Sequence, residues 1–250
     1  ASLLIRLFAS RRPSINPVRS VARAPMKSGS GSPEWSCSPR NTSSGRRPVC
    51  TIRQVEAGES GQVLTLAGTG QAGMIDGSAS EAAFDNPQGL AQDNRGNLWV
   101  VDTANHTIRR INTQTGRVET IAGLAGVAGL EDGTGEEARF NSPVGIAVER
   151  ESDAQRLERQ RLNQSPPPLT MIVTDTGNGV IRRVRDNGEV ETIGVPTEGT
   201  SGGSNVLGLT VSPLMFTSPT GVVVDPLGNI YVTDPGSGEV KTILSSGEVV

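Results

Sequence analysis

The sequence predicts an all-β protein, namely a partial β-propeller of four-stranded antiparallel blades. Three copies of one pattern carry this prediction, and they begin at Phe84, Phe140 and Phe216. In each copy, Phe-x-x-Pro-x-Gly precedes a hydrophobic run that ends in Asp. Self-similarity at a period of tens of residues is typical of repeat architectures. Short runs rich in Val, Ile and Thr, separated by Gly, Asn and Asp, indicate the strands of a β-meander.

The first copy divides into four expected strands. They are Gly89–Gln92, Asn97–Asp102, Thr107–Asn112 and Arg117–Ala122. Leu98 and Val100 would face one side of the second strand, because side chains alternate along a strand. Trp99 and Val101 would face the other side. Both faces are apolar, so we expect neighbouring sheets to cover the strand on both sides, as stacked propeller blades do.

A second recurring segment connects the copies. Asp76-Gly77 precedes the first copy and Asp132-Gly133 precedes the second, whereas Ser204–Met215 takes this place before the third. Long ordered connections of this kind commonly carry binding residues. We therefore expect Asp76 and Asp132 to contact a partner.

These motifs resemble the NHL-repeat family. The resemblance is carried by Gly96-Asn97-Leu98-Trp99-Val100-Val101-Asp102, by Asn105-His106-Thr107 at the Asn-His-Leu position that names the family, and by the connection before Phe84. The later copies read Asn178-Gly179 and Ser237-Gly238 at the Asn-His position. The chain is similar over residues 50–250 to NHL propellers of the teneurin and bacterial-plant types. The resemblance implies a propeller that is six-bladed when complete and is used mostly as a binding platform for protein or RNA.

We expect two regions in the chain. Residues 1–49 form a disordered or targeting extension, and residues 50–250 form the propeller, with a part-blade at 50–68 and repeats at about 84–123, 140–194 and 216–250. The part-blade is expected because Thr51–Val55 matches Thr107–Ile111. Closed propellers have roughly four to eight blades. We therefore expect either a fragment or an open array that self-associates through its open blade edges.

Composition gives further bounds. Residues 1–33 contain six basic and no acidic residues, which is typical of a chloroplast or mitochondrial transit peptide, a disordered tail being the alternative. No run of eighteen apolar residues occurs, so we expect no transmembrane span. The two cysteines, Cys37 and Cys50, lie outside the three copies, and we expect neither a disulfide framework nor a zinc site.

One copy contains an insertion. Asp175 follows Pro143 by 32 residues, whereas the corresponding spacing is 15 residues in the other two copies. We expect an inserted loop at 149–170 that protrudes from the hairpin of the first two strands. Its charged part favours a short helix ended by prolines. Its cationic residues are candidate partner contacts, the alternative being a solvated loop: Arg156, Arg159 and Arg161.

Recurring polar residues have structural and functional interpretations. His106 is the only histidine, so we expect no multi-histidine metal site, and we expect its side chain to cap a turn. Asp102, Asp175 and Asp234 recur at equivalent positions and favour acceptance of backbone N–H bonds in the turn. The alternative is that these carboxylates line a polar channel or bind a cation.

Paired arginines recur in the third strand, as Arg109-Arg110 and Arg182-Arg183. Neighbouring strand residues point to opposite faces. We expect one arginine of each pair to pack its stem between blades and to pair with an acid on the next strand, such as Glu119 or Glu191. In the alternative, Arg109 and Arg182 contact RNA, although a net charge of −3 gives no general attraction to it.

The sequence favours a non-catalytic scaffold that binds another protein, with no catalytic residue and no cofactor. One alternative is a hydrolase-like or lyase-like enzyme on a six-bladed propeller, with side chains from several blades around an axial metal ion. The other is an RNA-binding propeller, whose affinity would fall steeply with salt.

Overall fold

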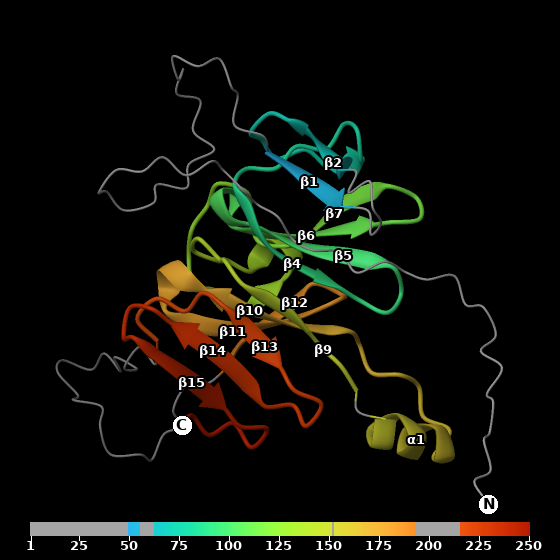
Figure 1. Ribbon diagram of the computed structural model, residues 1–250, viewed down its shortest axis with the longest axis vertical. Helices are drawn as coiled ribbons and strands as arrows, with labels where there is room; N and C mark the ends of the chain where they lie inside the picture. The colour runs from blue at the N-terminus through green and yellow to red at the C-terminus, as the bar shows by residue number, and fades with distance from the viewer. Residues whose placement is uncertain (1–49, 56–62, 152, 194–215) are drawn as a thin grey trace, which may run out of the picture.

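The computed structural model describes residues 50–55, 63–151, 153–193 and 216–250, which form four antiparallel sheets (Figure 1). Successive sheets stand side by side, as stacked blades do (Figure 1). The predicted extension at 1–49 and the connection at 204–215 lie outside the described residues. The mostly-β architecture and the antiparallel sheets confirm the predicted fold class.

Blade A is the first complete unit. It consists of β4 (Pro87–Gln92), β5 (Asn97–Asp102), β6 (Thr107–Asn112) and β7 (Arg117–Ala122), in that spatial order. The short strand β3 (Gly77–Ser78) of the preceding connection adds to β7. The last three strands of the blade coincide with the predicted runs. Strand β4 begins earlier than predicted, because Pro87 pairs with Asp102 across a register shift.

Blade B repeats this arrangement. It consists of β9 (Ile146–Glu149), β10 (Thr170–Asp175), β11 (Val180–Arg185) and β12 (Glu189–Ile193), with β8 (Gly133–Thr134) added to β12. Glu149 pairs with Thr170, so the hairpin stays in register on both sides of the insertion. The insertion carries α1 (Asp153–Arg161), which projects away from the sheets (Figure 1).

Blade C and the part-blade are smaller. Blade C consists of β13 (Val222–Val224), β14 (Ile230–Asp234) and β15 (Glu239–Ile243), and Val249 makes a bridge to Ile243 where blades A and B have a fourth strand. The part-blade consists of β1 (Cys50–Val55) and β2 (Val63–Gly70). These two strands occupy the places that β6 and β7 have in blade A.

Three short 3₁₀ turns connect these elements. They are η1 (Thr103–Asn105), η2 (Gly135–Glu137) and η3 (Thr176–Asn178). The residue after η1 is His106 and the residue after η3 is Gly179, with φ of 57° and 64°. Both turns therefore end in the left-handed region and enter the third strand in the same way.

The core lies between the blades. Leu98 and Val100 belong to the cluster that blade A shares with Ile52 of the part-blade. Trp99 and Val101 belong to the cluster that blade A shares with blade B. A third cluster joins blades B and C. The coverage of β5 on both faces confirms the expectation from its two apolar faces.

One cysteine overturns an expectation. Cys50 is buried at the start of β1 and is disulfide-bonded. Because both cysteines lie outside the three full copies, the sequence analysis predicts no disulfide, and for Cys50 this prediction is wrong. Cys50 begins the half-copy, at the position that His106 has in blade A. The only other cysteine, Cys37, lies outside the described residues.

The inner strands of neighbouring blades approach closely. A Cβ atom at Gly145 would lie less than 3.0 Å from the carbonyl oxygen of Thr220 in the next blade. Thr174 strengthens this contact, because its Oγ1 accepts from the N–H of Gly145 (2.7 Å) and donates to the Thr220 carbonyl (3.0 Å).

Gly145→Ala should therefore lower the free energy of unfolding by about 3 kcal/mol, because backbone atoms of two blades would be forced apart. Gly126→Ala is the control, since φ there is 72° but no atom lies within 4 Å of an added Cβ. The control should lower the free energy of unfolding by only about 1 kcal/mol, because alanine is strained in the left-handed conformation but contacts no neighbour. Urea denaturation measures both values, and equal losses would contradict the proposed close contact.

Candidate functional site

Two buried ion clusters of the same design hold blades A and B to the connections that precede them. Cluster A contains Asp76, Phe84, Asp102, Asn105 and Arg109, and cluster B contains Asp132, Phe140, Asp175, Asn178 and Arg182. In each cluster the Asp at the end of the second strand pairs with an arginine of the third strand. The distances are 2.9 Å in cluster A and 3.0 Å in cluster B.

The central carboxylate of cluster A has three donors. Asp102 Oδ2 accepts from Arg109 and from the Asn105 side chain (2.8 Å), and Oδ1 accepts from the backbone N–H of Asp85 (2.7 Å). The sequence pattern favours a backbone N–H donor within the turn. The donor lies instead in the segment that enters the blade, so the carboxylate joins that segment to the end of β5.

Arg109 uses all of its donor capacity. Its guanidinium donates to Asp102, to Asp76 (2.7 and 3.1 Å) and to the carbonyl oxygens of Ile75 (2.8 Å) and Ala83 (3.1 Å). The guanidinium also lies over the ring of Phe84, 4.9 Å from its centroid. One side chain therefore fixes both the connection and the strand end.

Cluster B repeats these contacts. Arg182 donates to Asp175, to Asp132 (2.7 Å) and to the carbonyl oxygens of Glu131 and Arg139 (both 2.7 Å). Its Nε is the one donor of the group without a hydrogen-bond partner in the described structure. The recurrence of the whole arrangement indicates a structural device that each blade needs.

Asp76 and Asp132, the predicted partner contacts in the connections, carry structural bonds. Besides the arginines, they accept from the backbone N–H of Thr120 (2.9 Å) and Thr192 (3.0 Å) respectively. Their side chains are still 44% and 51% exposed. Partner contact by these two residues stays a prediction.

Arg109 and Arg182 are not positioned to contact RNA. Both side chains are 0% exposed, because the blade and its connection enclose them. This corrects their alternative assignment as RNA contacts. The neighbouring arginines behave as expected, since Arg110 pairs with Glu119 (2.6 Å) and Arg183 pairs with Glu191 (2.9 Å).

Blade C has a weaker version of the cluster. Asp234 accepts from the backbone N–H groups of Thr217 (2.9 Å) and Ser218 (2.6 Å), and Lys241 takes the place of the arginine at 3.3 Å. The Lys241 ammonium lies 5.5 Å from the ring centroid of Phe216. Lys241 offers a single charged nitrogen, so it cannot bridge two carboxylates with the fixed fork of an arginine.

The equivalent carboxylates differ in acidity. Burial raises the pKa of the Asp102 carboxyl to about 6, more than its hydrogen bonds and the charge of Arg109 lower it. Burial likewise raises the pKa of Asp175. Burial tends to raise the pKa of Asp234 as well. Hydrogen bonds from Thr217, Ser218, Ser237 and Lys241 outweigh this effect of burial, so the pKa of Asp234 is lowered.

His106 does not cap its own turn, contrary to expectation. Its Nδ1 accepts from the backbone N–H of Ser142 (2.9 Å), which enters blade B. The backbone of His106 is left-handed, and its own N–H donates to the Thr103 carbonyl oxygen of η1. Burial lowers the pKa of His106, against the opposing charge of Asp175.

The predicted contacts on the insertion belong to α1, which projects away from the sheets (Figure 1). Arg159 pairs with Glu151 (2.9 Å) and Arg161 pairs with Glu158 (2.5 Å), while Arg156 is exposed. Within the described ranges, no three His, Cys, Asp or Glu side chains are grouped so that they could hold a metal ion. No helix in the described part of the chain is long and apolar enough to span a membrane.

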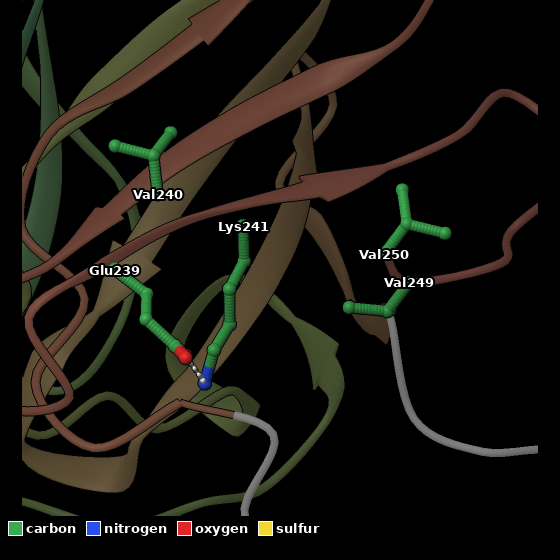
Figure 2. A pocket seen from close by; sticks show the side chains of 5 residues that line it. All are labelled: Glu239, Val240, Lys241, Val249 and Val250. Carbon is green, nitrogen blue, oxygen red and sulfur yellow. Dashed lines mark ion pairs between the residues drawn. The ribbon is translucent and has the colours of Figure 1, made fainter.

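A hollow lies on blade C, beside β15 (Figure 2). It is lined by Glu239, Val240, Lys241, Val249 and Val250. Figure 2 shows the Lys241 ammonium directed at the Glu239 carboxylate, 3.6 Å away. Within this hollow the polar groups pair with each other.

Sequence reasoning missed the pairing of Asp76 with Arg109, although the repeats contain a signal for it. The first two copies have both an Asp-Gly connection and an arginine at this strand position. The third copy lacks the Asp-Gly and has Lys241. Because the third copy lacks both the Asp of the connection and the arginine of the strand, we infer that these two residues form one contact.

The repeated Phe, the Asp-terminated second strand and the basic third strand together define the unit. Residues 84–111 and 216–243, which span this unit in blades A and C, match the family described as NHL repeat. The chain contains NHL repeats in these two segments.

Two curated relatives support the assignment. NHL repeat-containing protein 2 of Gallus gallus is 41% identical over 88 residues, which cover 34% of this chain and 12% of the relative. Protein SUPPRESSOR OF QUENCHING 1, chloroplastic, of Arabidopsis thaliana is 28% identical over 185 residues, which cover 72% of this chain and 16% of the relative. The chain therefore spans only a small part of the length of either relative.

A solved structure supports the fold. An auxiliary nutrient binding protein from Bacteroides thetaiotaomicron superposes with a TM-score of 0.53 at 18% identity. The match covers 78% of this protein and 42% of that chain. At this identity the similarity concerns the propeller fold alone. The count of six blades stays a prediction.

Arg109→Ala should lower the free energy of unfolding by about 3–5 kcal/mol, because it leaves Asp102 buried without its counter-charge. Arg110→Ala is the matched control, since its pair with Glu119 is about one-third exposed and should be worth about 0–1 kcal/mol. Denaturant unfolding of both variants gives the difference. Similar losses would contradict a dominant role of cluster A.

The carboxyl of Asp102 should titrate near pH 6, and that of Asp234 below its ordinary pKa of 3.8. The stability that Asp102 contributes is present below about pH 3.8 and is lost as the pH rises through about 6. The contribution of Asp234 has the opposite sign and is lost as the pH falls below its ordinary pKa. Carboxyl ¹³C NMR titration measures both, and Asp102 titrating at or below 3.8 would contradict the effect of burial.

Proposed function

We propose that this protein is a non-catalytic scaffold that binds another protein through the helix α1 and the two connections that the ion clusters hold. The observation that carries the proposal is the exposure of α1. Every residue from Gln155 to Arg161 whose side chain is described is exposed, except Arg159, which is half-buried.

A helix of 9 residues is short for independent stability. Most helices in proteins gain their stability by burying an apolar face. In α1, Leu157 is 63% exposed, and Leu162 directly after the helix is also exposed. These two side chains offer apolar surface to a partner, and the flanking arginines and glutamates offer charge. Binding would provide the packing that α1 lacks on its own blade.

The connections support the same proposal. Ile75 is 53% exposed, although its carbonyl oxygen is held by Arg109. Val127 and Leu130 are exposed in the second connection, next to the Glu131 carbonyl held by Arg182. The backbone is therefore fixed while apolar side chains face outward. Such preorganised apolar groups lose little entropy when they bind.

The proposal is tested by removing the insertion. Residues 150–168 are replaced with the four-residue turn Asp93–Gly96 of blade A, and partners are captured by quantitative cross-linking of the full chain in cells. We expect at least a tenfold loss of the specific partners with unchanged folding by circular dichroism. Leu157→Asp with Leu162→Asp should give a similar loss.

Leu227→Asp is the matched control for these substitutions. Leu227 is also exposed but lies in the turn between β13 and β14 of blade C. This control should leave the set of partners unchanged. Equal partner recovery from the control, the deletion and the parent chain would contradict the assignment of α1 as a binding element.

A further inference from the structure

The two connections meet at one residue of blade A. The first connection is residues 71–83 and the second is residues 123–139. The Asn105 side chain donates to the carbonyl oxygen of Gly73 (2.8 Å) in the first connection. The Asn105 carbonyl oxygen accepts from the N–H of Gly126 (3.2 Å) in the second. Two segments far apart in the sequence are therefore fixed side by side at η1.

Both connections leave apolar side chains in water close to this junction. Ile75 lies two residues after Gly73 and is 53% exposed, and Val127 directly follows Gly126 and is 43% exposed. Leu130, three residues further along the second connection, is 50% exposed. Exposed apolar groups that gather on a monomer and are rimmed by polar residues mark an interaction surface.

The charge around these side chains is one-sided. The two connections contain one basic residue, Arg139, and six acidic residues that are all exposed: Asp76, Glu81, Glu131, Asp132, Glu136 and Glu137. Arg139 is half-buried, and its guanidinium donates to the backbone carbonyl oxygens of Glu136 and Ala138. The net charge of the whole chain is only −3, so the connections concentrate negative charge.

The ion clusters add to this imbalance. Each cluster has one arginine that faces two carboxylates. The carboxylate at the strand end is 0% exposed, whereas Asp76 and Asp132 of the connections are 44% and 51% exposed. One negative charge per cluster therefore has no counter-charge within the cluster, and the connection presents it to solvent.

We propose that the connection surface, formed by Ile75, Val127 and Leu130 with the acidic residues around them, binds a partner-protein segment whose apolar face is flanked by Lys or Arg. This inference rests on the proposed scaffold function and names the chemistry of its partner at the connections. The apolar face of the segment covers the three exposed side chains, and its cations supply the missing counter-charge. The same carboxylates repel an acidic segment or the phosphates of RNA.

Two synthetic peptides test the proposal with the full chain. Both have the same helical pattern of leucines, and the remaining positions are lysine in one and glutamate in the other. Each carries a fluorescent label for titration by anisotropy. The Leu–Lys peptide should bind saturably and more weakly at high salt, because exposed charges are screened. The Leu–Glu peptide should not bind.

Two double variants separate the apolar and the charged contributions. Ile75→Ser with Leu130→Ser should lower the affinity for the Leu–Lys peptide about tenfold, because less apolar area is removed from water. Glu131→Gln with Glu136→Gln should lower it about fivefold, since exposed charge pairs are individually weak. All four side chains are exposed, so circular dichroism should show an unchanged fold.

Matched controls lie on blade C. Val223→Ser with Leu227→Ser removes two exposed apolar side chains, and Glu239→Gln with Glu248→Gln removes two exposed carboxylates. Both controls should bind the Leu–Lys peptide as the parent chain does. Equal affinity of all variants, binding of the Leu–Glu peptide, or binding of single-stranded RNA with no binding of the Leu–Lys peptide would overturn the proposal.

The deletion of the insertion separates this inference from the proposed function. It should leave the affinity for the Leu–Lys peptide unchanged, because α1 is not part of the connection surface. Loss of cellular partners on deletion, together with no binding of the Leu–Lys peptide, would overturn the connection surface alone. Unchanged partners on deletion, together with specific peptide binding, would contradict the role of α1 alone.

Discussion

The arrangement of this chain depends on the buried pair between the Asp that ends the second strand and the basic residue of the third strand. A charge in a protein interior is costly unless it is paired and hydrogen-bonded, so each side chain requires the other. Asp102 and Arg109 also collect backbone groups from the segment that precedes the blade. The requirement for pairing therefore becomes a requirement on the path of the chain.

This constraint explains why the connections are ordered without a large core of their own. The Phe that begins each repeat packs beneath the cation, and Asp76 or Asp132 ties the connection to the outer strand. Apolar residues such as Ile75 can then remain outside. A rigid backbone with exposed apolar side chains is well suited to recognition, which links the ion clusters to the proposed scaffold role.

The sequence predicted the blades well because their signals are local and repeated. Alternating apolar residues between Gly-rich and Asn-rich turns defined β5, β6 and β7 to the residue. The partners of the polar residues were harder to predict, because they depend on contacts between distant segments. His106 bonds to Ser142 in the next blade, and Arg109 bonds to Asp76 in the preceding connection. The sequence contains one signal for the pair of Arg109 with Asp76, because the third copy lacks both the Asp and the arginine.

Blade C is held by a weakened form of this pair. Lys241 holds Asp234 at 3.3 Å with one charged nitrogen, where blades A and B have the fork of an arginine. Its outward face also leaves Val223 and Val240 in contact with water. Among the described blades, local opening should therefore be easiest at blade C, so that the pair that shapes each repeat also sets the order in which the repeats open.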